Sequence, residues 1–214
     1  MYDRECTSPC TIPVSFFQNV YYNVAECEGV LTWDLFKELL QHFAQIKYPT
    51  KQDAPLLSPT TFRGTRGKAN ASTAGAVVID ADDGLWFEDA LTALRARGTA
   101  AVLYTTASNR TGNRFRIVVP LTEQVDPETY KRVLIAICRT ISGRDWRGDI
   151  GKVGPYNLFY VPGTYKGAEN RSRSSPASSC RPMGGWNSAL LTRQAKHRRL
   201  APRGPSPSTP HGPR

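Results

Sequence analysis

Two aspartates at the end of an apolar run are the first candidates for chemistry. Asp80 and Asp82 follow Ala-Val-Val-Ile at positions 76–79, a run typical of a buried strand. Residues two apart in a strand lie on the same face. Two carboxylates there repel unless a cation lies between them, and Mg²⁺ or Mn²⁺ prefers such oxygen ligands. The spacing predicts a metal site, with a strand-end turn as the alternative.

Later polar residues add what phosphate chemistry requires. Arg114 and Arg116 belong to a predicted strand at 114–120. Guanidinium groups bind phosphate oxygens through paired hydrogen bonds. Ser108 and Asn109 precede that strand in a polar loop and supply neutral donors. Combined with carboxylates that hold a metal, this set suits phosphoryl transfer.

The order of the predicted elements explains how these side chains would meet. Apolar patterns and capping signals predict strands at 76–80, 100–104, 114–120 and 156–161, and helices at 85–97 and 126–142. This is a βαββαβ order, the split pattern of ferredoxin-like and RNA-recognition folds. Right-handed crossovers would put the first and third strands in the middle and the fourth beside the first. The edge with Asp80 would then also hold the loop that carries Asp145 and Asp149.

The N-terminal part of the chain adds an α/β extension to this core, which makes the expected fold class α+β. Thr32 is a suitable N-cap for a helix that runs to about Gln45. The stretch 46–74 has no periodic pattern but contains Arg63, Arg66 and Lys68. We expect a flap there that binds nucleic-acid phosphates, with a solvated insert as the alternative.

Composition sets the class of partner. The chain has 214 residues, and 28 Lys and Arg outnumber 18 Asp and Glu. The net charge of +10 favours a polyanionic partner, with a basic tail as the alternative source. We expect a flexible N-terminus at 1–13, a catalytic domain at 14–165 and a basic, Pro/Ser/Arg-rich disordered tail at 166–214.

The five cysteines and the absence of long apolar runs bear on the compartment. No pair of cysteines has the CxxC spacing of a zinc site, so free thiols in a reducing cytoplasm are expected. No segment has the pattern of a signal peptide or a membrane span, so a cytoplasmic protein without a membrane partner is expected. The sequence contains neither a GxxxxGK[ST] loop nor a His-x-His pair, which disfavours a P-loop ATPase and a rolling-circle nickase.

Three runs together resemble the catalytic core of the archaeo-eukaryotic primase superfamily, in particular primase and primase-polymerase domains of plasmid and phage replication proteins. The runs are VVIDADDG, AVLYTTASNRTGNRFRIVVPL and DWRGDIGKVGPYNLFYVPGTY, and the resemblance extends roughly from Leu57 to Tyr165. It implies an RNA-recognition-like core of the primase type. It also implies that Asp80, Asp82 and Asp149 bind catalytic Mg²⁺ or Mn²⁺, with Asp145 as the alternative to Asp149.

The resemblance further implies a nucleotide site at Ser108, Asn109, Arg114 and Arg116. Asn109 stands about where the family has a histidine. Asparagine donates a hydrogen bond but carries no charge, which points to weaker nucleotide binding or a degenerate enzyme. The implied activity is two-metal transfer of nucleoside triphosphates on a single-stranded DNA template. The larger relatives continue into a helicase domain, so a separately encoded replicative helicase is an expected partner.

Two other functions fit the same sequence. One is a non-catalytic module for replication initiation that binds single-stranded DNA through aromatic side chains on its sheet, with Phe115, Phe159 and Tyr160 as candidates. The other is a nuclease or phosphodiesterase that uses the same carboxylates in hydrolysis.

Overall fold

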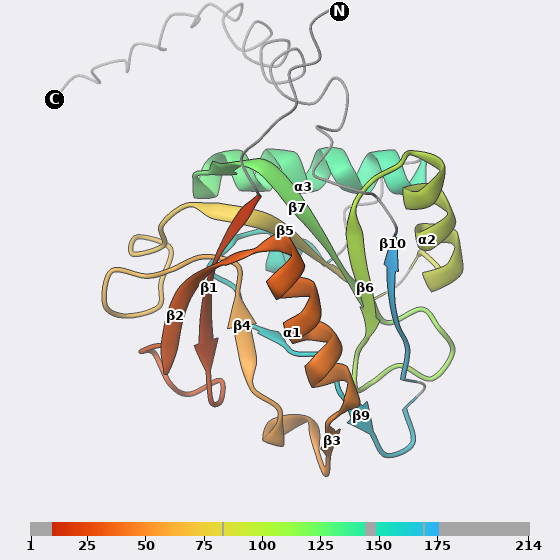
Figure 1. The fold of residues 1–214 in the computed structure, drawn as a ribbon, viewed down its shortest axis with the longest axis horizontal. Helices are drawn as coiled ribbons and strands as arrows, with labels where there is room; N and C mark the ends of the chain where they lie inside the picture. Colours follow the sequence, from red (N-terminus) through yellow and green to blue (C-terminus); the bar gives the residue numbers. More distant parts are fainter. Residues whose placement is uncertain (1–9, 83, 144–148, 169, 176–214) are drawn as a thin grey trace, which may run out of the picture. The chain divides into compact units, whose positions relative to one another are not determined.

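Two four-stranded antiparallel sheets and three α-helices make an α+β fold in the computed structural model of the chain (Figure 1). The structure describes residues 10–82, 84–143, 149–168 and 170–175. The antiparallel sheets and the three helices confirm the expected α+β class. Within these described residues, no helix combines the length and apolar character that crossing a membrane requires.

The first sheet carries the predicted chemistry. Its strand order is β10-β6-β7-β5, and the strands are β5 (Ala74–Ala81), β6 (Ala101–Thr105), β7 (Phe115–Val125) and β10 (Ser172–Ser175). Every residue of β5 and β6 is buried, which explains the continuous apolar runs in the sequence. β7 lies between β5 and β6, so residues from three strands face one another in cross-strand rows.

The second sheet is built from the N-terminal region. Its order is β2-β1-β4-β8, and the strands are β1 (Thr11–Phe17), β2 (Cys27–Thr32), β4 (Leu56–Ser58) and β8 (Phe159–Tyr160). A short parallel pair joins β3 (Lys47–Tyr48) to β9 (Thr164–Tyr165). β1 begins before the predicted domain start at 14, and it crosses β5 closely. A Cβ atom at Gly75 would lie 2.0 Å from the backbone oxygen of Thr11, so only glycine fits at this crossing.

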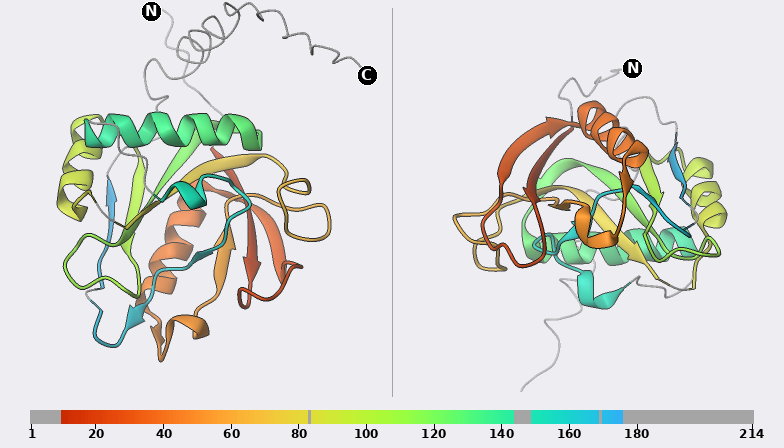
Figure 2. Two further views of the ribbon diagram at one scale, coloured as in Figure 1. Left: turned by 180° about the vertical axis from the view of Figure 1, so that it is seen from behind. Right: turned by 90° about the horizontal axis from the view of Figure 1, so that it is seen from below.

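The helices begin and end where local signals predict. They are α1 (Trp33–Gln45), α2 (Phe87–Ala96) and α3 (Pro127–Ser142). Thr32 caps α1 by accepting a hydrogen bond from Leu35 N–H, and Asp126 caps α3 by accepting from Glu128 and Thr129 N–H. α1 and α3 lie on opposite faces of the fold (Figure 2).

The predicted fourth strand is the main correction to the expected core. Of residues 156–161, Phe159 and Tyr160 form β8, which pairs with β4 in the second sheet rather than with β5. At the edge of β5 where that strand was expected, the hydroxyl of Tyr130 from α3 accepts from Val78 N–H at 3.0 Å and donates to Val78 O at 3.4 Å. A helix side chain therefore satisfies the strand edge.

The apolar core lies between the two sheets and α1. It joins side chains from β1, β5, β6, β7 and β8, namely Ile12, Val14, Val78, Val102, Val118 and Phe159. Cys10 at its margin is disulfide-bonded, contrary to the expected free thiol, whereas Cys27 and Cys138 are free. The functional side chains described below lie on the sheet face that borders this core.

Candidate functional site

Asp80, Arg116 and Tyr104 form one cross-strand row on the first sheet. Asp80 of β5 is the register partner of Arg116 of β7, and Arg116 is the register partner of Tyr104 of β6. All three are buried, with exposed fractions of 2% for Asp80, 5% for Arg116 and 0% for Tyr104. A charged pair therefore lies inside the apolar layer between the sheets.

The carboxylate of Asp80 and the guanidinium of Arg116 make a close ion pair. Arg116 Nε lies 3.2 Å from Asp80 Oδ1, and Arg116 Nη2 donates to Asp80 Oδ2 at 3.5 Å. The 3.2 Å approach lacks the alignment of a hydrogen bond, which leaves Nε and Oδ1 buried without a hydrogen-bond partner. Burial alone would raise the pKa of Asp80, but Arg116 and then Lys152 outweigh it and hold that pKa below its ordinary value.

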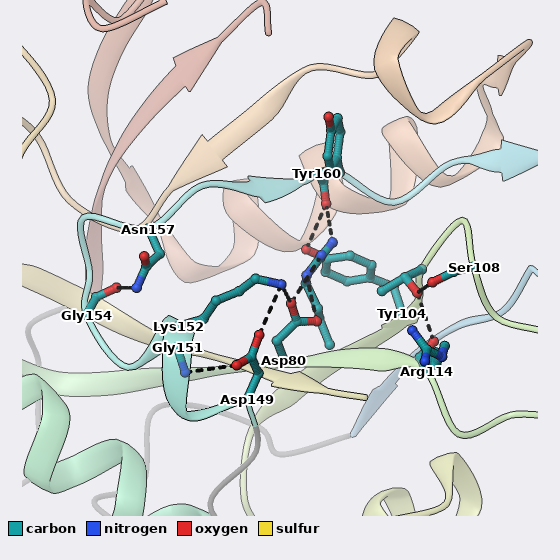
Figure 3. A network of polar contacts seen from close by, with 12 residues as sticks. Asp80, Tyr104, Ser108, Arg114, Asp149, Gly151, Lys152, Gly154, Asn157 and Tyr160 are labelled. Atoms are coloured by element: carbon teal, nitrogen blue, oxygen red, sulfur yellow. Dashed lines mark hydrogen bonds and ion pairs between the residues drawn. The ribbon is translucent and has the colours of Figure 1, made fainter. Parts of the chain in front are cut away.

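The backbone of β8 closes over this row. The Tyr160 carbonyl oxygen accepts from Arg116 Nη1 at 2.9 Å and from the Tyr104 hydroxyl at 3.3 Å (Figure 3). The guanidinium also lies over the Phe159 ring, with Cζ 5.6 Å from its centroid. Arg116 therefore joins the first sheet to the second. Its side chain is only 6% exposed, and its contact with a triphosphate stays a prediction.

The second cation at Asp80 is Lys152. Its ammonium donates to Asp80 Oδ2 and lies 3.5 Å from Asp149 Oδ2 (Figure 3). Asp149 is the N-cap of the short 3₁₀ helix η2 (Ile150–Lys152), and its Oδ1 accepts from Gly151 N–H at 2.8 Å. One helical turn thus brings Asp149 and Lys152 together, and the ammonium takes the place between two carboxylates where a metal ion was expected.

Asp149 is also tied to Asp80 through the backbone. Asp149 N–H donates to the backbone oxygen of Asp80 at 2.9 Å. The predicted meeting of Asp80 with the later aspartate is thus present in the fold. Asp145, the alternative third ligand, lies outside the described residues. Asp82 follows the end of β5 and is half-buried. Among the described residues, no three His, Cys, Asp or Glu side chains form a cluster that could hold a metal ion.

The predicted nucleotide residues of the hairpin loop have different environments. Ser108 and Arg114 are exposed, and Ser108 Oγ lies 3.2 Å from Thr106 Oγ1. Asn109 is fully buried, and its Oδ1 accepts from Gly112 N–H at 2.9 Å and Arg114 N–H at 3.2 Å. The carboxamide of Asn109 therefore holds the loop in shape, and its contact with a nucleotide stays a prediction.

The predicted basic flap is a loop with internal hydrogen bonds that follows β4 of the second sheet. Arg63 and Lys68 are exposed, and Arg66 is half-buried with its Nε lacking a hydrogen-bond acceptor. The described side chains of the flap make no hydrogen bond or ion pair with Asp80, Arg116 or Lys152.

Sequence reasoning did not assign Lys152 or Lys51 a role at the carboxylates. Lys152 follows Asp149 by three residues, a spacing that brings side chains together on one helical turn, so this signal was available. Lys51 of η1 (Lys51–Asp53) places its ammonium 4.8 Å from the centroid of the Tyr160 ring. Burial, followed by the charges of Arg116 and Lys152, lowers the pKa of Lys51. Nothing local in the sequence relates Lys51 to Asp80.

One hollow of the described surface lies outside the group of Asp80, Asp149 and Lys152. This hollow of about 500 Å³ is lined by Gly84, Leu85, Trp86, Asp89, Asn113, Ile141 and Ser142. Neither Asp80 nor Lys152 lines it. Four charged side chains converge away from this hollow, and we take them as the candidate site. This Asp80 cluster consists of Asp80, Arg116, Asp149 and Lys152.

Comparison with known proteins gives one structural likeness. No family model matches the chain, and no curated protein matches it. The fold is similar to the AEP domain of the primase-polymerase (PrimPol) of cyanophage S-2L, with 13% identity and a TM-score of 0.41. The match covers 82% of this chain and 86% of that chain. A likeness at this TM-score carries no argument about the activity of this chain.

Proposed function

We propose that the chain is a primase-like nucleotidyltransferase that joins nucleotides on a single-stranded DNA template, with its centre at Asp80, Asp82 and Asp149. The observation that carries the proposal is the contact between residues 80 and 149, whose backbone groups are hydrogen-bonded at 2.9 Å. These aspartates come from separate runs of the primase-like sequence pattern. The primase-like sequence pattern is also our reason for proposing that the fold around these aspartates is a primase-type core.

The donor set is compatible with Mg²⁺ or Mn²⁺. The carboxylates of Asp80 and Asp149 already converge on one cation, the Lys152 ammonium, and Asp80 Oδ1 has no hydrogen-bond partner. Mg²⁺ is commonly held by one or two carboxylates together with substrate phosphates. Asp80 and Asp149 would hold the ion once Lys152 withdraws, with Asp82 beside them. A bound ion would neutralise phosphate charge and activate the attacking hydroxyl group.

The remaining residues of the cluster then have distinct tasks. Arg116 fixes the Asp80 carboxylate, because its Nη2 donates to Asp80 and its Nη1 donates to the Tyr160 carbonyl. Lys152 has a side chain that is 34% exposed, so its ammonium can turn from Asp80 towards a phosphate group. Arg114 is exposed just before β7 and contributes a second phosphate contact.

One observation favours a second function. Asp80 is 2% exposed and already paired with two cations, so the cluster is electrically balanced without a metal ion. In that case the chain is a non-catalytic module that binds single-stranded DNA during replication initiation.

A transfer assay separates these functions. Wild-type protein with Mn²⁺ or Mg²⁺, nucleoside triphosphates and a single-stranded template should make short products. Asp82→Asn combined with Asp149→Asn should reduce product at least a hundredfold, while Asp89→Asn on exposed α2 should not. No product from a wild type that binds single-stranded DNA equally with and without metal would establish the binding module. Release of mononucleotides from DNA would instead identify a nuclease.

A further inference from the structure

The loop between β1 and β2 presents two tyrosine rings to solvent. Tyr21 is 89% exposed and Tyr22 is 52% exposed. The loop is locally ordered, since Asn19 Oδ1 accepts from Tyr21 N–H at 2.9 Å. By contrast, the rings of Phe115 and Phe159, expected as stacking candidates on the sheet, are fully buried in the core. Rigid aromatic rings held in water at a loop tip are suited to contact with a partner.

The tyrosine loop is fastened to the basic flap. Arg66 N–H donates to the Asn23 oxygen at 2.6 Å, and Val24 makes an antiparallel bridge with Thr65. The two loops are therefore neighbours although they come from different parts of the chain. This arrangement puts two exposed tyrosines beside the cations of the flap.

The flap itself is held in a defined shape. Phe62 makes an antiparallel bridge with Ala71, and Arg63 N–H donates to Asn70 O at 2.9 Å. Asn70 Nδ2 donates to Thr65 O at 2.9 Å. Because these bonds fix the backbone, the basic side chains start from a preorganised loop, which lowers the entropy cost of binding.

The charges on this surface lack internal counter-ions. Among the described residues, no carboxylate forms an ion pair with Arg63, Arg66 or Lys68. The nearby Glu28 is exposed, and its Oε1 accepts from Ser15 Oγ at 2.5 Å and from Phe62 N–H at 2.9 Å rather than from the basic side chains. Glu26, which flanks β2, is a second exposed acidic residue nearby. The flap therefore has spare positive charge, and the buried Arg66 Nε has no acceptor.

Tyr160 is part of the surroundings of the Asp80 cluster. Burial, followed by the charge of Tyr21, raises the pKa of Tyr160. Lys51 lies over the Tyr160 ring, and the backbone oxygen of Tyr160 accepts from Arg116. An aromatic ring and basic side chains thus also meet beside the candidate site.

We propose that the loop surface, defined as Tyr21, Tyr22, Arg63, Arg66 and Lys68, binds single-stranded nucleic acid. Bases stack on the two tyrosine rings, and the cations contact the phosphates. Stacking on aromatic rings beside basic groups is the common mode of binding single strands without sequence preference. The inference rests on the proposed function, because the strand bound at this surface would serve as the template of that reaction.

Fluorescence anisotropy of a labelled oligothymidylate, measured with EDTA and without nucleotides, tests this surface separately from catalysis. Tyr21→Ala combined with Tyr22→Ala should weaken binding at least about tenfold. Tyr21→Phe combined with Tyr22→Phe should retain wild-type affinity, because phenylalanine keeps the stacking ring. Trp86→Ala should have no effect, since this 55% exposed aromatic belongs to the start of α2, away from the tyrosine loop (Figure 1).

Other results would overturn the inference. Wild-type affinity of the double alanine variant, equal losses in the Trp86 variant, equal affinity for double-stranded DNA, or no binding by the wild type would each do so. Circular dichroism with a melting curve confirms that the variants fold. Because the assay contains no metal, a failed transfer assay with normal, tyrosine-dependent binding would reject the proposed enzyme and keep the surface.

Discussion

The ammonium group of Lys152 contacts the carboxylate of Asp80 across 72 positions of sequence. The same ammonium lies 3.5 Å from Asp149, so one cation lies between two carboxylates and reduces their mutual repulsion. Lys152 thus performs the electrostatic task that the sequence pattern assigns to a divalent ion.

Replacing Lys152 by methionine should therefore change metal binding and stability in opposite directions. Without metal, the two carboxylates lose a counter-ion and the free energy of unfolding should fall by ~1 kcal/mol, since the ammonium is partly solvated. The affinity for Mn²⁺, measured by electron paramagnetic resonance titration, should rise about tenfold, because no ammonium has to be displaced. Lys131→Met on exposed α3 is the matched control. Unchanged or weaker Mn²⁺ binding by Lys152→Met would contradict this role.

Arg116 should matter far more for stability than its neighbour Arg114. Arg116→Met leaves Asp80 buried with only Lys152 as a partner, and breaking a buried pair in this way costs about 3 kcal/mol or more. Arg114→Met removes an exposed side chain and should change the free energy of unfolding by less than ~0.5 kcal/mol. Urea denaturation followed by tryptophan fluorescence measures both.

The Asp80→Asn, Arg116→Met double variant completes a thermodynamic cycle with the single variants. If the pair interacts as described, the double variant loses clearly less stability than the sum of the single losses. Strict additivity would mean that the 3.2 Å approach of Nε and Oδ1 contributes nothing.

The cap of α3 should give a pH-dependent contribution to stability. Hydrogen bonds from Thr129, and then from Glu128, lower the pKa of Asp126 below its ordinary value. A carboxylate with a lowered folded-state pKa stabilises the fold above its unfolded-state pKa of about 3.9 and loses that contribution as the pH falls through the folded value. Asp126→Ala should cost ~1 kcal/mol at pH 7, and this difference should shrink below about pH 4.

Asp126→Asn serves as the control, because asparagine caps a helix without titrating. Denaturation curves of the three proteins at pH 7 and pH 3 measure the effect. A difference between wild type and Asp126→Ala that is as large at pH 3 as at pH 7 would rule out the charged cap as its source.

The predicted elements were most accurate where neighbouring residues decide the structure. Thr32, Asp126 and Pro127 fix the starts of α1 and α3 through bonds within one turn. The fourth strand was misplaced because strand pairing depends on distant partners. Residues 159–160 pair with β4, and the Tyr130 hydroxyl of α3 bonds to the edge of β5 instead. Both partners are distant in sequence.

The same division holds for the site. The topology predicted that Asp80 and the loop around Asp149 would meet, because strand order constrains which ends of the chain come together. It did not predict the partners of Asp80, since ion pairs depend on side-chain reach and burial. The task of Asn109 was also hidden, because a buried asparagine that holds a loop looks like a polar loop residue in sequence.

The Tyr160 carbonyl, which accepts hydrogen bonds from Arg116 and Tyr104, has a consequence for how the protein folds. Its partners lie 44 and 56 positions away, and these hydrogen bonds join the second sheet to the first. Contacts of high sequence separation form slowly, because the loop must close before they stabilise the chain. The Asp80 cluster is therefore completed only after both sheets have assembled. A partly folded chain would lack the final arrangement of its carboxylates and their cationic partners.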